Sequence, residues 1–230
     1  MAMKRRITIL LLLVLAVGML CMSGCQEEVK ETIGKFGKVS NGLFLYSDLA
    51  VQDSFVDSFD TKRYVLSEYR ALLNEELAEY NKTHPFNPGD PEKRSKKEPD
   101  YHTAITVVTC ETSGQKLVQQ LLYATPEDFL EYNAGELAKR KGSVLKVGTL
   151  DRVDTSILTM SYVSPAGKEI SVQELCALQN AGDYRYMICD LEALIYGDGQ
   201  IICFSTNATY NEENICVSAR GGEKVVVIFK

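Results

Sequence analysis

The sequence predicts an α+β fold: a mostly antiparallel sheet with one longer N-terminal amphipathic helix and two short helices. Two observations lead to this class. The clearest helical period comes early, at residues 66–80, whereas the chain after residue 182 consists almost entirely of strand and turn patterns. Those late strands are not separated by helices long enough for parallel crossovers, so we expect antiparallel pairing. A single domain is predicted over residues 39–230.

The first 24 residues have the pattern of a lipoprotein signal peptide. Basic residues at positions 4–6 precede an apolar run, residues 7–20, that is shorter than a membrane-spanning helix. The run is followed by Met-Ser-Gly-Cys at residues 22–25, which resembles the lipobox of bacterial lipoproteins, with Met22 in the place usually held by Leu. We therefore predict cleavage between Gly24 and Cys25.

Cys25 is the predicted lipidation site, and residues 25–38 are the predicted tether. A lipobox cysteine carries a diacylglycerol on its sulfur, and two acyl chains give stable anchoring where one is marginal. The polar residues 26–28 that follow support this interpretation. A plain signal peptide with an incidental cysteine is the alternative. The lipobox predicts an extracytoplasmic protein that is anchored to the outer face of the cell membrane through acyl chains on Cys25.

Composition limits the partners of the domain. Removal of residues 1–24 takes away three basic residues and no acidic ones, so the formal net charge changes from −6 to −9. This charge repels nucleic acid and anionic lipid headgroups, and we expect no nucleic-acid partner. The 230 residues, 45% of them hydrophobic, suffice for one good core.

Five cysteines remain once Cys21 is removed and Cys25 is acylated. They are Cys110, Cys176, Cys189, Cys203 and Cys216. The odd number leaves at least one thiol unpaired if disulfides form. The first interpretation of these cysteines is that they are small buried hydrophobic residues on strands. One or two disulfides are the second interpretation. A metal site is the weakest, because no Cys-x-x-Cys pair occurs.

The first half of the domain combines a helix with strands. A short strand or arm begins at Val39, and the helix follows at residues 66–80. Its apolar stripe consists of Leu66, Tyr69, Leu73, Leu77 and Tyr80, with Leu72 widening it. Four prolines make residues 83–100 an exposed loop. A hairpin is predicted over residues 101–124 from its β-branched strands and central turn.

The second half begins with a capped helix and ends in strands. Thr125 and Pro126 are typical of a helix start, and a break is expected near Gly135. Residues 143–150 and 156–165 are predicted as strands, and Ser171 opens a short helix. The predicted final strands are joined by hairpin turns at the glycine-containing segments 197–199 and 221–222.

The sequence shows no catalytic constellation, so no catalytic residue, metal site or cofactor is predicted. Two histidines, His84 and His102, flank the proline-rich loop near three acids and could form a metal site, but solvated loop histidines are the commoner case. Cys110 lies too far along its strand to pair with His102. The paired acids considered are Asp57 with Asp60 and Glu75 with Glu76, which we interpret as solvated. Nucleotide-binding glycine loops are missing.

Tyrosines are the remaining candidates for a contact surface. The chain has 12 Tyr and no Trp, and several tyrosines gather in the C-terminal strand region. These are Tyr162, Tyr184, Tyr186, Tyr196 and Tyr210. A tyrosine ring suits a carbohydrate or protein surface, but lining of a β-rich core is the stronger interpretation.

Two segments resemble a known group of proteins. The helix FDTKRYVLSEYRALLNEELAEYN at 59–81 and the segment YATPEDFLEYN at 123–133, together with the strand-rich tail, are similar to surface lipoproteins of low-GC Gram-positive gut bacteria. This group has no established activity or catalytic residue, so the resemblance assigns no role to any position. It implies a cell-surface setting that favours free thiols.

A non-enzymatic binding or protein-interaction module is therefore the first functional hypothesis, with an unknown protein or small ligand as partner. A cell-envelope enzyme whose site is assembled from scattered residues is the second. The third is an assembly or chaperone-like accessory protein that would use the apolar helix face or an open sheet edge.

Overall fold

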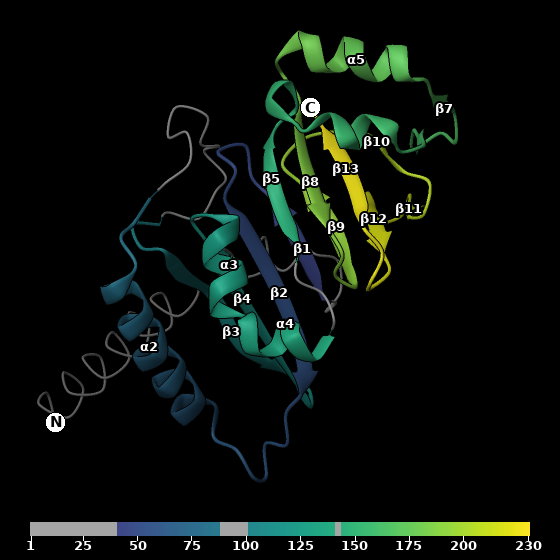
Figure 1. Cartoon of the computed structure of the whole chain (residues 1–230). Helices are drawn as coiled ribbons and strands as arrows, with labels where there is room; N and C mark the ends of the chain where they lie inside the picture. The colour runs from purple at the N-terminus through teal and green to yellow at the C-terminus, as the bar shows by residue number, and fades with distance from the viewer. Residues whose placement is uncertain (1–40, 88–100, 141–143) are drawn as a thin grey trace, which may run out of the picture. The chain divides into compact units, whose positions relative to one another are not determined.

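The computed structural model describes residues 41–87, 101–140 and 144–230 (Figure 1). The predicted fold class is wrong. Within these ranges the chain forms two sheets with 13 strands and four helices where one mostly antiparallel sheet was expected, and the helix predicted at residues 66–80 is present after two strands. The predicted signal peptide, the lipidation site Cys25, the tether and most of the proline-rich loop lie outside the described residues.

Sheet A has seven strands in the order β11-β12-β9-β1-β2-β4-β3. Their bounds are β1 Gly42–Leu45, β2 Val51–Ser58, β3 Ile105–Ser113, β4 Lys116–Tyr123, β9 Ala193–Gly197, β11 Thr209–Asn211 and β12 Cys216–Ala219. The hairpin predicted for residues 101–124 is confirmed as β3 and β4. Strand β1 pairs antiparallel with β2 and parallel with β9. It thereby joins the N-terminal strands to the C-terminal strands.

Sheet B has six strands in the order β5-β8-β13-β10-β6-β7. Their bounds are β5 Leu145–Thr149, β6 Tyr162–Val163, β7 Glu169–Ile170, β8 Arg185–Cys189, β10 Ile201–Ser205 and β13 Val225–Phe229. Every residue of β13 is buried. Val225, Val227 and Phe229 belong to the core shared with sheet A, whereas Val226 and Ile228 belong to a second core on the opposite face. Sheet B is therefore covered on both sides.

The C-terminal strands alternate between the two sheets. Strand β9 lies in sheet A and β10 in sheet B, and β12 lies in sheet A and β13 in sheet B. The predicted hairpins at residues 197–199 and 221–222 are therefore wrong, because both segments carry the chain from one sheet to the other. At Gly197 the sheets approach closely: an added Cβ would lie 2.4 Å from the Phe229 ring. Only glycine fits there without a shift of that ring.

Helix α2 (Leu66–Thr83) follows β2 and packs on β3 (Figure 1). Leu73 and Leu77 are buried, but Leu72 is 66% exposed and does not widen the stripe as expected. Two polar side chains of the helix reach the backbone of edge strand β3. Arg70 Nε donates to the Cys110 carbonyl (2.7 Å), and Asn81 Nδ2 donates to the Ile105 carbonyl (2.9 Å). The helix thus protects part of an open edge.

Helices α3 (Pro126–Tyr132) and α4 (Ala134–Arg140) form a bent pair beside β4 and β5. The predicted cap is confirmed, since Thr125 Oγ1 accepts from the Asp128 N–H at 3.1 Å. The break falls at Asn133, two residues before the predicted Gly135. Asn133 donates from its side chain to the Phe129 carbonyl at 2.9 Å, which holds the corner between the two helices.

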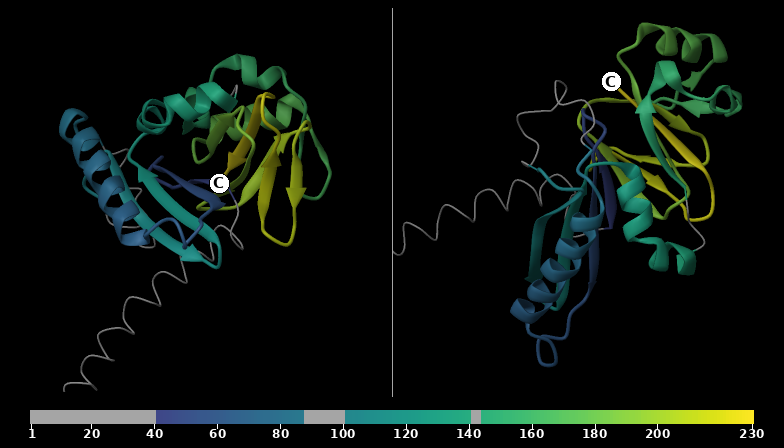
Figure 2. Two further views of the ribbon diagram at one scale, coloured as in Figure 1. Left: turned by 90° about the horizontal axis from the view of Figure 1, so that it is seen from below. Right: turned by 60° about the vertical axis from the view of Figure 1, so that its left-hand side comes forward.

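Helix α5 (Val172–Ala181) and the segment before it cover the face of sheet B that is turned away from sheet A (Figure 2). The cap at Ser171 is confirmed: its hydroxyl accepts from the Glu174 N–H (3.2 Å), and Glu174 accepts from the Ser171 N–H (2.9 Å). The strand predicted over residues 156–165 is mostly wrong. Thr155–Thr159 is a 3-10 helix, and only Tyr162–Val163 is a strand.

Ser171→Ala should lower the free energy of unfolding by about 1 kcal/mol, because an N-cap hydroxyl satisfies a backbone N–H that the helix cannot. The loss is measurable by urea denaturation. Ser113→Ala, at the exposed end of β3, is the control and should stay within about 0.5 kcal/mol of the parent. Equal effects of the two substitutions would show that the cap contributes nothing.

All five cysteines of the predicted domain are unbonded thiols, and four of them are buried. Burial raises the pKa of Cys189 to about 11 and that of Cys203 to about 12. These thiols are therefore protonated at neutral pH and pack as small hydrophobic side chains, as the first interpretation of the cysteines predicts. In the described ranges, no helix is long and apolar enough to cross a membrane.

Candidate functional site

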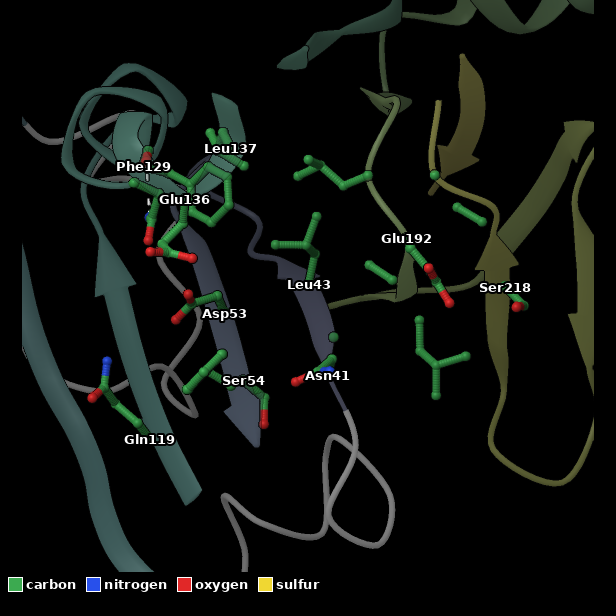
Figure 3. A pocket seen from close by; sticks show the side chains of 18 of the residues that line it. Asn41, Leu43, Asp53, Ser54, Gln119, Phe129, Glu136, Leu137, Glu192 and Ser218 are labelled. Carbon is green, nitrogen blue, oxygen red and sulfur yellow. Dashed lines mark hydrogen bonds between the residues drawn. The ribbon is translucent and has the colours of Figure 1, made fainter. Parts of the chain in front are cut away.

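A cavity of about 980 Å³ lies on the face of sheet A that carries α3 and α4 (Figure 3). Strands β1 and β2 contribute residues to its floor. The helical side is formed by α3, α4 and Tyr69 of α2, and the opposite side by residues 191–194 and 218–221. This volume is at the upper end of the range usual for small-molecule sites. We call it the Asp53 cavity.

Asp53 lies on β2, next to the helical side of the cavity (Figure 3). Its Oδ1 accepts from the Leu121 N–H at 3.2 Å, and its Oδ2 accepts from the Tyr123 hydroxyl at 3.3 Å. Tyr123 is in turn held by Asn133, whose Nδ2 donates to the phenol oxygen at 3.1 Å. Backbone and side chains from β4 and the α3–α4 corner therefore fix the carboxyl group at the cavity wall.

Burial raises the pKa of Asp53 from 3.8 to about 7, against the opposing effect of the hydrogen bonds from Leu121 and Tyr123. A carboxyl group in this position exchanges its proton near neutral pH. Perturbed acids of this kind gather at functional sites.

The phenols around Asp53 stay neutral. Burial is the largest cause that raises the pKa of Tyr69, Tyr123 and Tyr132, and nearby negative charges add to it. Tyr69 donates its hydroxyl to Gln119 Oε1 at 2.6 Å, and both residues line the cavity. The side of the cavity around Asp53 thus combines neutral donors, amides and apolar side chains with carboxyl groups.

The opposite side of the cavity comes from the C-terminal strands. Glu192 and Ser218 project from this side in Figure 3, and Arg220 lines the cavity nearby. Asn41 connects the two sides at the floor. Its side-chain oxygen accepts from the Val56 N–H (2.9 Å) and its carbonyl accepts from the Leu194 N–H (3.3 Å). The cavity therefore depends on the pairing of β1 between β2 and β9.

The histidines considered as metal ligands have other contacts. The His84 ring lies 2.9 Å from the Tyr80 carbonyl through Nδ1 and 3.0 Å from Glu131 Oε1 through Nε2. His102 lies edge-on to Phe86, at 6.4 Å between ring centroids. Within the part of the chain that the structure describes, no group of three or more His, Cys, Asp or Glu could hold a metal ion. The nearby acids at 90, 98 and 100 lie outside that part.

His84 should make stability depend on pH. Its hydrogen bonds to the Tyr80 carbonyl and to Glu131 raise its pKa above 6.5. Its contribution is therefore complete below about pH 6.5 and is lost as the pH rises through the folded-state value. We expect the difference in unfolding free energy between the parent and His84→Gln to be larger at about pH 5 than at about pH 9. A difference that is constant over this range would contradict a charged His84–Glu131 pair.

The other sequence candidates have structural roles. Asp60 accepts from the Lys62 N–H at 3.0 Å and pairs with Arg63, so it builds a turn. Asp57 accepts from the Ser58 N–H at 2.7 Å at the exposed end of β2. Both Glu75 and Glu76 are exposed on α2. Burial raises the pKa of Cys110, which leaves it a poor nucleophile.

The C-terminal tyrosines line the cores. Tyr162 and Tyr196 are buried. Tyr184 and Tyr186 pack on the core of sheet B, and Tyr210 packs on the core shared by the two sheets. None of the five lines the Asp53 cavity. Their interpretation as core residues is confirmed.

Asp53 itself was missed by the sequence analysis. Residues 51–58 were not predicted as a strand, because the segment continues directly into the stronger helical pattern. In the strand, Val51, Asp53 and Phe55 project to the same face, since side chains alternate. The sequence did contain a signal for the site: Asp53 lies two positions after the buried Val51, so an acidic residue lies on the same face of the strand as a core residue.

Comparison with known proteins adds no relative: no protein-family model, no curated protein and no solved structure matches this chain. The site therefore has to be interpreted from its own geometry.

Proposed function

We propose that this protein is an extracytoplasmic lipoprotein, anchored through Cys25 to the outer face of the cell membrane, whose domain binds a small ligand in the Asp53 cavity. The cavity carries this proposal, because it combines a volume of about 980 Å³ with a fixed carboxyl group, amides and apolar side chains. This is the usual composition of a ligand pocket. The module has a binding role and needs no catalytic residue.

The membrane anchor is tested by Cys25→Ser. Removal of the acylated sulfur should release the protein from the membrane fraction, since no acyl chain can then hold it. Cys176→Ser, which changes a free thiol on α5, is the matched control and should remain in the membrane. Tight membrane association of the Cys25→Ser protein would contradict the anchor.

Ligand binding is tested by native mass spectrometry of the full chain purified from its own cells in detergent. We expect a mass excess that survives desalting and is lost in Ser218→Trp, because Ser218 lines the cavity and an indole there would fill it. Val172→Trp, at an exposed position of α5, should keep the excess. A bare parent mass, or an excess unaffected by Ser218→Trp, would contradict the proposal.

An envelope enzyme is the second candidate, and one observation favours it. Burial raises the pKa of Asp53 to about 7, which suits a general acid or base that works near neutral pH. Turnover in a panel of hydrolase assays that Asp53→Asn abolishes would favour this candidate over simple binding.

A chaperone-like role through the apolar face of α2 receives no support. Leu73 and Leu77 are buried in the core, and Tyr69 is engaged with Gln119. That face covers the chain's own sheet and is not available to a partner.

A further inference from the structure

We propose that the ligand of the Asp53 cavity is a saccharide, recognised through several of its hydroxyl groups. The inference rests on the proposed function and adds the chemical class of the ligand. It is carried by polar side chains of the cavity wall that the protein holds in place but whose hydrogen-bonding capacity it does not use up.

Asp53 and Gln119 lie on the same face of neighbouring strands. Asp53 of β2 stands opposite Leu121 of β4, two positions from Gln119, so the two polar side chains are diagonal neighbours. Gln119 Oε1 accepts from the Tyr69 hydroxyl at 2.6 Å. The amide nitrogen of Gln119 donates to no atom of the described chain, so two N–H donors remain for a ligand in the cavity that this residue lines.

Asn133 supplies an acceptor at the corner between α3 and α4. Its Nδ2 donates to the Phe129 carbonyl at 2.9 Å and to the Tyr123 hydroxyl at 3.1 Å. A carbonyl oxygen only accepts, so the first contact fixes which end of the amide carries the nitrogen. Asn133 lines the cavity, and its Oδ1 receives no hydrogen bond from the described residues. This oxygen is therefore available to a ligand donor.

The carboxyl group of Asp53 serves a hydroxyl group in either protonation state. Its oxygens accept from the Leu121 N–H and the Tyr123 hydroxyl, and each oxygen keeps a second lone pair. Towards a ligand hydroxyl, an ionised carboxylate accepts and a protonated one donates. A hydroxyl group can also do both, so it matches the N–H donors of Gln119 as well as the acceptor of Asn133.

The remaining lining suits the rest of a sugar ring. Phe129, Leu137 and Leu43 line the cavity and can contact the C–H faces of such a ring. Ser218 projects from the opposite side and adds a group that both donates and accepts (Figure 3). An apolar ligand would displace water from the amides without replacing its hydrogen bonds, which is costly. A peptide group, with one donor and one acceptor on separate atoms, matches fewer of these side chains.

The test measures binding by calorimetry with the full chain, in a detergent that has no sugar headgroup. The probes are methyl pyranosides and disaccharides of glucose, galactose, mannose and N-acetylglucosamine. The control compound is 2-(hydroxymethyl)tetrahydropyran, which keeps the ring and loses the ring hydroxyls. We expect at least one saccharide to bind at least about 10-fold more tightly than this compound, because the latter leaves the amides unpaired. A blocked dipeptide, N-acetylalanine methylamide, should bind more weakly than that saccharide.

Variants test the role of the amide. Gln119→Met removes the amide from a side chain of similar length and should weaken binding of that saccharide by about 10-fold. Gln173→Met, at an exposed position of α5, is the matched control and should bind as the parent does. Urea denaturation checks that each variant is folded. Tyr69→Phe, which removes only the hydroxyl that holds the Gln119 amide, should weaken the same binding by about 3-fold.

Several results would overturn the saccharide assignment: no saccharide binding at millimolar concentration, equal affinity for the tetrahydropyran compound, tighter binding of the blocked dipeptide, or unchanged binding in both Gln119→Met and Tyr69→Phe. In each of these cases a native mass excess that Ser218→Trp removes would leave the ligand cavity standing. A lack of binding by every probe together with a bare native mass would overturn both the saccharide and the ligand cavity.

Discussion

Phe229→Ala should lower the free energy of unfolding by about 3–5 kcal/mol, the range for removal of a fully buried aromatic side chain. Phe229 is completely buried on β13 and belongs to the core that both sheets share. Its ring also fills the space next to Gly197 of β9. The substitution therefore leaves a cavity at the junction of the sheets, measurable by urea denaturation with an unchanged m-value.

A double-mutant cycle with Gly197 sharpens this test. Gly197→Ala alone should be destabilising, because its Cβ would lie 2.4 Å from the Phe229 ring. In the Phe229→Ala background that obstacle is gone, so the second substitution should cost much less. Additive losses would show that the two residues do not meet and would contradict the way the chain crosses between its sheets.

Asp53→Asn should change the pH dependence of stability by about 4 kcal/mol, which corresponds to a pKa rise from 3.8 to about 7. The sign follows from the direction of the rise. The folded protein holds the proton of Asp53 more strongly than the unfolded chain does. Stability is therefore lost as the pH rises from about 4 to about 7, and the loss is complete above the folded-state pKa.

Comparison of the parent with Asp53→Asn isolates this effect, because every other titration is common to both proteins. The variant should gain on the parent by about 4 kcal/mol between about pH 4 and pH 8. Asp57→Asn, at an exposed end of the same strand, should show no such gain. A flat difference for Asp53→Asn would mean that the carboxyl group is fully solvated.

Local features of the fold were predictable because they depend on a few neighbouring residues. Thr125 and Ser171 were recognised as helix caps from the residues that follow them, and both caps are present. The hairpin of β3 and β4 was recognised in the same way. These features need no knowledge of the rest of the chain.

The arrangement of the sheets was not predictable because it depends on distant partners. The glycines at 197–199 look like hairpin turns, but the strands on either side pair with β1 and β13 in different sheets. A glycine pattern does not distinguish a hairpin from a crossing. The single predicted sheet was wrong for this reason, and β2 was hidden beside a stronger helical period.

The site was missed for the same reason. Asp53 and Glu136 are 83 positions apart in the chain and Glu192 lies farther still, so no local motif joins them. The sequence search looked for neighbouring acids such as Asp57 and Asp60, which lie at the exposed end of β2 and in the turn that follows it. The Asp53 carboxyl group lies in a strand whose sequence shows no catalytic motif.

The titration of the Asp53 carboxyl carbon by NMR, in the full chain, tests the account of the Asp53 cavity most directly. We expect a midpoint near pH 7, because burial disfavours the charged form of the carboxyl group. A midpoint near 4 would contradict the burial of this carboxyl group at the cavity.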